Sequence, residues 1–380
     1  MAKLGKAYLT GAALTICGVA GTCHAQSSVL LFGTLDEGIN FTSNASGKHA
    51  FQMTSVDLVA SRWGLKGDEN LGGAWHAVFD IESGFNVESG SAAYGGRLFG
   101  YQSYIGMQNE KFGSVTLGRQ FDSIVDMIGP LTANSSWGGL LFSHPLDNDN
   151  TDATWHASNS IKYTSAVYGG ITSTAMYGFS NQPGSFAGNR VWSAGLSYTH
   201  ETFTAAAAYA DLGAPGTNAT GAIASNDSGF VAENQKIWGV ATNYGFSSVS
   251  LGAVYTHTLI KQALSSIYIG NLGFNSLNFD NAELNVRYTV TPAFFVGAMY
   301  TFTRATLQQV GEHVLHWNQF GVAAQYSLSK RTAVYAQYVY QKVSGGGTGT
   351  NLDHAYIPGA NDVSSNSHQM LARVGLTHSF

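Results

Sequence analysis

The sequence predicts an all-β fold, a sixteen-stranded antiparallel transmembrane β-barrel, and three observations lead to this prediction. The chain of 380 residues contains 46 Gly, 19 Tyr and 21 Phe but only six Pro, and 11% of its residues are charged. This composition is typical of many strands joined by tight turns. Beyond residue 25, no apolar run reaches the ~20 residues that a membrane helix requires. Polar and apolar residues instead alternate, as in the strands of a membrane barrel.

The first 25 residues read as an export signal. Lys3 and Lys6 provide a positive start, the following residues are mainly apolar, and residues 23–25 resemble a signal-peptidase site. The apolar stretch is too short to span a membrane comfortably as an anchor. We therefore expect a cleaved signal peptide at 1–25 and a transmembrane β-barrel domain at 26–380.

Cysteine and charge content exclude several classes of protein. Both cysteines, Cys17 and Cys23, lie in the predicted leader, so a disulfide framework and a thiol catalyst are excluded from the rest of the chain. The formal net charge is −5, and the leader contains two lysines but no acidic residue. The remaining chain is therefore more acidic still, which argues against a nucleic-acid partner.

Alternation is clear in segments 283–290 and 319–327, where apolar residues occupy every second position. Many such segments extend for about 9 to 13 residues, the length of a tilted membrane crossing rather than of a typical strand in a soluble sandwich. Aromatic residues gather near the segment ends, as Tyr335, Tyr338 and Tyr340 do. This placement suits a girdle of aromatic rings at the membrane surface.

Sixteen strands are expected from this pattern, and all six prolines lie between them, as required of a residue that cannot donate to the sheet. The expected spans are 28–43, 54–67, 72–84, 97–109, 113–121, 158–168, 171–181, 190–201, 202–212, 235–246, 249–260, 281–290, 293–306, 314–328, 331–343 and 367–380.

The connections between the expected strands alternate in length, with short turns on one side and long loops on the other, as in bacterial barrels. The long polar loops are expected at 122–157, 213–234, 261–280 and 344–366. The glycine-rich stretch 344–349 lacks the Lys-Ser/Thr pair of a phosphate-binding loop. We interpret it as a flexible linker.

Five segments resemble a known family when they are taken in order: 31–38, 61–73, 113–122, 159–165 and 373–380. Over 28–380 the sequence resembles a Gram-negative general porin of the β-proteobacterial type. The resemblance implies a passive, water-filled outer-membrane channel for ions and small hydrophilic solutes, without a cofactor. It also implies a homotrimer and a third long loop folded into the lumen.

The resemblance also implies which side chains line the narrowest point of the pore, where basic wall residues face acidic residues on the inserted loop. Arg62 and Arg119 match wall arginines of the family, although alternation alone does not decide which face Arg119 occupies. Lys162 shares a polar face with its neighbours and is expected in the lumen from pattern alone. The expected basic wall is Arg62, Arg119, Lys162, His156 and Tyr101, and the expected acidic loop residues are Asp122, Asp126 and Asp147.

Two wall positions depart from the family pattern. Tyr101 and His156 stand where relatives often carry arginine. The basic wall is therefore thinner, and one part of it could change charge near neutral pH, because histidine titrates there. We expect a weaker anion preference than in strongly basic members of the family.

The final strand ends at Phe380 and has to pair with the first strand to remove the open edge of the sheet. A terminal aromatic residue resembles the signal that the outer-membrane assembly machinery reads. Lipid and lipopolysaccharide of the outer membrane are the other expected partners.

Other functions remain as alternatives. A substrate-selective outer-membrane channel would favour sugars if aromatic residues such as Tyr101 and Trp137 lined the lumen. A barrel enzyme or an adhesin is a further alternative, but no Gly-x-Ser-x-Gly elbow lies in a strand-to-helix context. His313 and His316 have no third ligand close in sequence. We therefore predict no catalytic residue and no metal.

Overall fold

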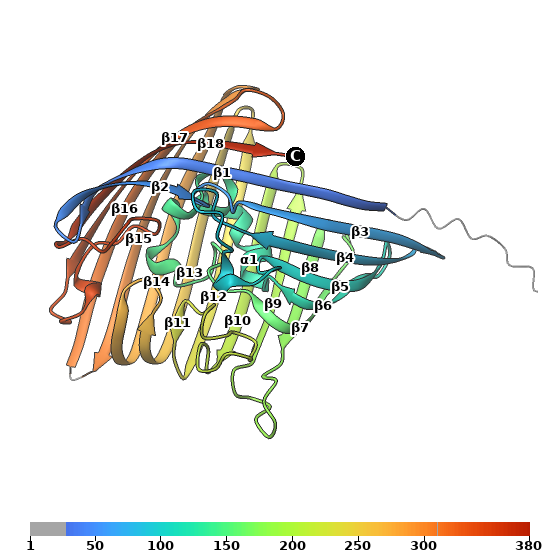
Figure 1. Cartoon of the computed structure of the whole chain (residues 1–380), viewed down its shortest axis with the longest axis horizontal. Helices are drawn as coiled ribbons and strands as arrows, with labels where there is room; N and C mark the ends of the chain where they lie inside the picture. The colour runs from blue at the N-terminus through green and yellow to red at the C-terminus, as the bar shows by residue number, and fades with distance from the viewer. Residues whose placement is uncertain (1–27, 310) are drawn as a thin grey trace, which may run out of the picture.

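The computed structural model describes residues 28–309 and 311–380, and the predicted signal peptide at 1–25 lies outside them. The described chain forms one closed antiparallel sheet of eighteen strand segments (Figure 1). Because β2 and β3 share one crossing and the short β11 precedes β12, sixteen strands surround the lumen. The predicted fold class is confirmed.

The strands are β1 (Ser28–Ala45), β2 (Lys48–Ser55), β3 (Arg62–Gly72), β4 (Trp75–Gly84), β5 (Gln102–Asn109), β6 (Gly113–Gln120), β7 (Ala157–Thr164), β8 (Ile171–Gly178), β9 (Val191–His200), β10 (Phe203–Gly213), β11 (Phe230–Val231), β12 (Asn234–Phe246), β13 (Val249–Ser266), β14 (Gly270–Thr291), β15 (Phe294–Gln309), β16 (Gly311–Ser327), β17 (Thr332–Gly345) and β18 (His368–Ser379). The α-helix of the described residues is α1 (Ser123–Met127). No helix in this part of the chain is long and apolar enough to cross a membrane.

Pairing of β1 with β18 closes the barrel, with Thr34 opposite Ser379 and Thr42 opposite Leu371. The backbone of Phe380 continues this ladder beyond β18. Its N–H donates to the Gly33 carbonyl over 3.0 Å, and the Gly33 N–H donates to the Phe380 carbonyl over 3.1 Å. Closure removes the unpaired edge of the sheet, as the sequence predicts.

Alternation along each strand gives the wall an apolar outer face and a polar inner face. In β14, Leu284 lies exposed on the outside, whereas Glu283 and Asn285 are buried on the lumen side. Tyr300 of β15 stands opposite Leu284 and is also exposed. The outer face therefore presents the apolar and aromatic surface that a lipid-facing barrel requires.

The second crossing differs from the predicted strand 54–67. It is made of β2 and β3, and residues 56–61 between them leave the sheet. Val56 adopts a positive φ of 67°, which turns the chain away from the strand direction. The freed backbone is bonded locally, because the Leu58 N–H donates to the carboxylate of Asp36 over 3.0 Å. Alternation continues across such a break, so the sequence pattern does not reveal it.

The expectation of a long loop at 261–280 is wrong, since β13 continues to Ser266 and β14 begins at Gly270. The inner side chains of this tall hairpin, among them Phe274 and Leu277, are buried. They pack in one cluster with Leu352 from the connection between β17 and β18. The outer residues of this segment are polar, so the sequence predicts a loop. In the structure, the connection that carries Leu352 covers the hairpin from inside and stabilises it as part of the sheet.

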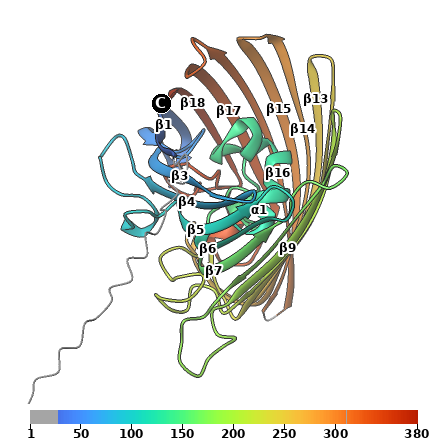
Figure 2. The same ribbon diagram turned by 90° about the vertical axis from the view of Figure 1, so that its right-hand side faces the viewer.

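Long strands from β13 to β17 make one tall side of the barrel, and the opposite side is built from the shorter β3 to β8 (Figures 1 and 2). The connection between β6 and β7, which includes α1, lies inside the ring (Figure 2). We call residues 121–156 the inserted loop. Its position agrees with the long loop expected in the lumen.

Arg373 of β18 fixes the closing strands from the lumen side. Its guanidinium donates to Asp36 of β1 over 3.2 Å and to Asp57 of the strand break over 3.0 Å. It also donates to the Tyr335 hydroxyl of β17 over 2.8 Å. The side chain is fully buried, so one cation holds together the closing strands and the break that follows β2.

Replacing Arg373 by Gln should destabilise the barrel strongly, because two buried carboxylates lose their cation. The expected loss is about 3–5 kcal/mol in the free energy of unfolding, measured by urea unfolding of the refolded protein in detergent micelles. The exposed Arg331→Gln change in a short turn provides the control and should stay within about 0.5 kcal/mol of the wild type. Equal stability of the two variants would refute this account of closure.

Candidate functional site

The inserted loop begins with α1, which Asp122 caps. One carboxylate oxygen of Asp122 accepts a hydrogen bond from the Ile124 N–H over 2.6 Å, as expected of an N-cap residue. Ile124 and Met127 are buried in a cluster with Ala208 of β10. The loop therefore enters the lumen along the wall of β8–β10 rather than across open water.

Aromatic residues of the inserted loop pack on glycines of the tall wall. A Cβ atom at Gly297 of β15 would lie 2.7 Å from the Trp137 ring, and one at Gly321 of β16 would lie 2.5 Å from the Phe142 ring. Both rings are buried, and they contact each other at a centroid distance of 5.2 Å. The inserted loop therefore packs its aromatic side chains on the tall wall.

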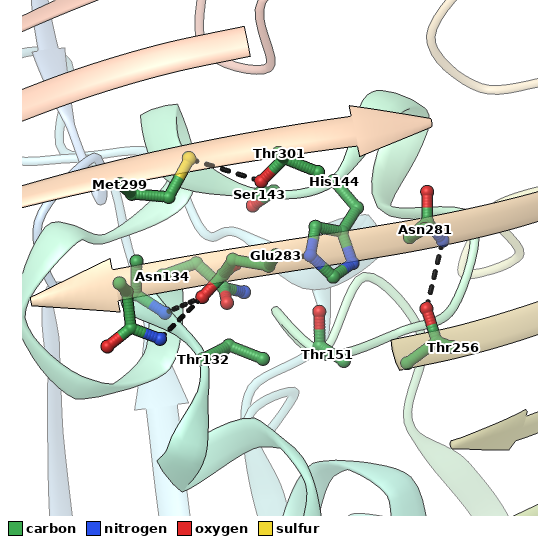
Figure 3. Close-up of polar contacts among 12 residues, drawn as sticks. Thr132, Asn134, Ser143, His144, Thr151, Thr256, Asn281, Glu283, Met299 and Thr301 are labelled. Carbon is green, nitrogen blue, oxygen red and sulfur yellow. Dashed lines mark hydrogen bonds and ion pairs between the residues drawn. The ribbon is translucent and has the colours of Figure 1, made fainter. Parts of the chain in front are cut away.

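His144 attaches the same loop to β14 electrostatically. Its Nδ1 lies 2.6 Å from an Asp149 oxygen, and its Nε2 lies 3.1 Å from an oxygen of Glu283. Figure 3 shows the His144 ring beside Glu283. All three side chains are fully buried. Burial alone would lower the pKa of His144, but the two carboxylates raise it to about 10. His144 is therefore an imidazolium that bridges the loop and the wall.

Polar residues around this bridge complete the attachment. Thr256 and Asn281 of the neighbouring strands are joined by a 2.9 Å hydrogen bond beside the imidazolium (Figure 3). Three wall glutamines donate to backbone carbonyls of the loop: Gln235 to Asn148, Gln319 to Ser143 and Gln337 to Gly138. A buried backbone needs such partners, so the loop conformation is set by its wall.

Two of the predicted basic residues face the lumen as bonded pairs. Arg62 donates from Nε to Glu82 over 2.6 Å, and Lys162 donates from Nζ to Asp126 over 2.7 Å. Glu82 lies on β4, next to β3 in the sheet, whereas Asp126 belongs to α1 of the inserted loop. Asp126 is therefore the one predicted acidic residue that meets a predicted basic residue.

Arg119 also lies inside, although it shares its sequence phase with outward-facing residues. The register of β6 shifts between Gly118 and Gln120, and this bulge turns Arg119 inward. The guanidinium donates to both carboxylate oxygens of Asp227, over 2.6 and 2.9 Å. Asp227 comes from the connection between β10 and β11, and no sequence pattern places this connection against Arg119.

Tyr101 and His156 belong to an aromatic cluster at the same height. The Arg62 guanidinium lies 4.5 Å from the centre of the Tyr101 ring. The His156 ring lies 4.9 Å from Phe121, 5.1 Å from Tyr94 and 5.6 Å from Tyr101. The two positions at which the sequence departs from the expected family pattern are therefore occupied by packed rings.

His156 is fully buried, and neither ring nitrogen has a hydrogen-bond partner within the described part of the chain. Burial, with Arg119 and Arg97 nearby, lowers the pKa of His156 well below its usual value. Its surroundings therefore favour the neutral ring. This direction opposes the expected wall charge that titrates near neutral pH.

Two of the three predicted acidic loop residues have roles different from those expected. Asp122 and Asp147 are buried and do not line the lumen. Asp122 caps α1 and accepts from Asn150 over 2.7 Å, while Asp147 accepts from the Thr154 hydroxyl over 2.6 Å. Both carboxylates shape the loop, so neither faces passing solutes.

A cavity of about 480 Å³ lies between the inserted loop, the break at 56–60 and the connections that follow β4 and β10. Its polar and aromatic lining includes Tyr94, Tyr101, Phe121, Asn134, Asp152, Thr154, Asn226, Asp227 and Tyr268. Tyr94 and Tyr268 lie in connections, where alternation carries no information, so sequence reasoning did not single them out. Within residues 28–309 and 311–380, no group of three or more His, Cys, Asp or Glu could hold a metal ion.

A closed membrane barrel whose lumen is narrowed by an inserted loop defines a channel protein of the porin class. The sequence model of the Gram-negative porin family matches residues 11–346, and the chain belongs to this family. It is a general diffusion channel of the outer membrane.

Among curated relatives, an outer membrane porin of Bordetella pertussis is 29% identical over 87% of this chain and 93% of its own length. Outer membrane porin protein 32 of Delftia acidovorans is 24% identical over 97% of this chain and 98% of its own length. Among solved structures, the anion-selective porin from Comamonas acidovorans has a TM-score of 0.71 at 20% identity and covers 93% of this chain, over 100% of its own length. This last likeness concerns the fold.

Replacing His144 by Gln should release the inserted loop, because Asp149 and Glu283 remain buried without their cation. We expect a loss of about 3–5 kcal/mol in the free energy of unfolding and noisier single-channel current. His368→Gln, at an exposed histidine of β18, is the control. The triple variant H144Q/D149N/E283Q removes the unpaired charges and should recover much of the stability. A triple variant as unstable as H144Q would contradict the electrostatic role.

The same bridge predicts a pH dependence on the alkaline side. The folded-state pKa of His144, about 10, lies above the unfolded value of about 6.5. Its stabilisation is therefore complete below about pH 6.5 and is lost as the pH rises towards 10. The unfolding temperature of the wild type and of H368Q should fall over this range, and that of H144Q should fall less. Parallel pH profiles for all three proteins would rule out a charged His144.

Proposed function

We propose that ions and small hydrophilic solutes diffuse passively through the space between the inserted loop and the shorter wall. The observation that carries this proposal is the cavity of about 480 Å³ at the height of Arg62 and Tyr101, bounded by both surfaces. Polar groups and rings line it, so hydrated solutes meet hydrogen-bonding partners along the route. Passage of this kind needs no covalent step and no cofactor, and a catalytic role is not required.

The bonded pairs set the size and polarity of this route. Arg62, Arg119 and Lys162 each lie within 2.7 Å of a carboxylate oxygen. Opposite charges at such distances largely cancel at the distance of a solute in the middle of the pore. We infer that the basic wall shapes the constriction and produces only a weak attraction for anions.

Residues on the outer surface support three assignments of partners: a second subunit, lipopolysaccharide and the assembly machinery. Ile39, Phe51 and Met53 of β1 and β2 are exposed and apolar, which suits a subunit interface in a homotrimer. The solved structures similar to this chain include a trimer form of OmpT from Vibrio cholerae, with a TM-score of 0.65 and 16% identity over 93% of this chain and 99% of its own.

Lipopolysaccharide is the second partner. Exposed Arg304 and Lys342 on the tall strands would contact its phosphates.

Phe380 supports the third assignment, recognition by the outer-membrane assembly machinery. Its backbone completes the closing ladder, and its ring lies against the backbone of Gly33. A terminal aromatic residue that joins the first and last strands suits recognition by the outer-membrane assembly machinery before closure.

Purified protein in a planar lipid bilayer should produce ohmic current that rises in groups of three steps, as expected of a trimer of open pores.

Ala60→Trp, which places a bulky ring on the cavity lining, should reduce the conductance several-fold and slow sugar entry in liposome swelling. Ala336→Trp on the exposed outer face of β17 is the matched control and should conduct normally. A silent bilayer combined with lipid or peptide hydrolysis would overturn the channel proposal.

A further inference from the structure

The charged residues that line the cavity are acidic. None of the residues that line the cavity is Lys, Arg or His. The lining contains two carboxylates, Asp152 and Asp227, and Asp227 is held by both guanidinium nitrogens of Arg119. Asp152 is therefore the one cavity-lining carboxylate of the described chain with no cation within 4.0 Å.

Asp152 is half-buried and its hydrogen bonds come from neutral groups. Asn134 donates from its amide to one carboxylate oxygen over 3.3 Å. The Asp152 N–H donates to Asp147 over 3.0 Å, which fixes the backbone beneath the side chain. Neutral donors orient a carboxylate without cancelling its charge, so its field extends into the cavity.

Aromatic rings in the cavity lining also favour cations. Tyr94, Phe121 and Tyr268 line the same cavity, and the faces of such rings attract cations. The Tyr268 hydroxyl lies 2.7 Å from the Thr154 hydroxyl, close to the loop segment that carries Asp152. Tyr101 contributes less, because its ring already lies against Arg62.

We propose that this channel selects cations over anions and that Asp152 is the specificity-determining residue, with the neighbouring rings favouring cations of the ammonium type. The inference rests on the proposed passage between the inserted loop and the wall. It reverses the sign of the selectivity named for the anion-selective porin from Comamonas acidovorans. The reversal follows from rings at Tyr101 and His156, because the cavity lining then contains no Lys, Arg or His. Arg97 lies next to the lining, where it donates to the Tyr94 carbonyl and to Asn226.

Enclosure in the cavity wall raises the pKa of Asp152 to about 7, so its charge is present at pH 8 and absent at pH 5. Cation selectivity should therefore decrease as the pH falls. The ionisable groups beside or facing Asp152 are Asp147, Asp149 with His144, Asp57 with Arg373, Tyr94, Tyr101 with Arg62 and Glu82, and Tyr268.

Reversal potentials in a tenfold KCl gradient test the proposal. At pH 8 the wild type should pass K⁺ in preference to Cl⁻, and Asp152→Asn should lower this ratio about fivefold, the effect of one unit charge at about 4 Å in water. Asp152→Glu should retain the preference. Glu110→Gln removes the same charge from an exposed short turn and should leave the ratio unchanged. Heat-modified mobility on gels establishes that each variant is folded.

Two further measurements test whether Asp152 causes the pH dependence and the preference for ammonium-type cations. At pH 5 the wild-type ratio should approach that of D152N. His156→Asn should keep the wild-type pH dependence, since burial lowers the pKa of His156 well below its usual value. Tetramethylammonium should permeate the wild type more readily than D152N relative to Cl⁻.

An anion-selective wild type, or a D152N ratio equal to that of E110Q, would overturn the inference while leaving the open channel intact. Absence of conductance in every variant would instead reject the proposed function on which it rests.

Discussion

His144 holds a positive charge inside the barrel, between Asp149 of its own loop and Glu283 of β14. Removing three ionised groups from water is expensive, and the cost is offset only when each is closely paired. The pairing therefore works in one geometry, with the loop pressed against the tall wall. Trp137 and Phe142 then reach Gly297 and Gly321, and the free lumen shifts towards the shorter strands.

The position of the loop determines what the opposite wall can do. Once the tall side is covered, the route passes beside β3–β6, where the predicted basic residues lie. Their charges are matched by carboxylates from three sources: the neighbouring strand β4, the inserted loop and the connection that carries Asp227. A lumen lined by matched pairs is polar and wettable, yet it has little net positive field. The wall of this chain thus stays polar while its cations are paired.

The barrel was predictable because its physical cause is local. Every second residue faces lipid, so alternation identifies β14 or β16 from sequence alone. Prediction was wrong where tertiary packing decided the outcome, as at 261–280, where Leu352 covers the hairpin from inside. The site was predictable in part: Lys162 follows from its strand phase, whereas Arg119 turns inward through a bulge. Asp227 lies 108 residues from Arg119, and no local pattern connects them.

In this channel, the inserted loop and the connection that carries Asp227 decide which cations of the wall are paired. A strand residue has one of two faces, and the lipid fixes one of them, so its freedom to change is small. A loop inside the lumen is limited only by the need to satisfy its backbone and charges, which wall glutamines and His144 accomplish here. With the backbone satisfied, a single loop carboxylate such as Asp152 can set the charge at the constriction. Ion preference can then change sign without any change in the barrel that surrounds it.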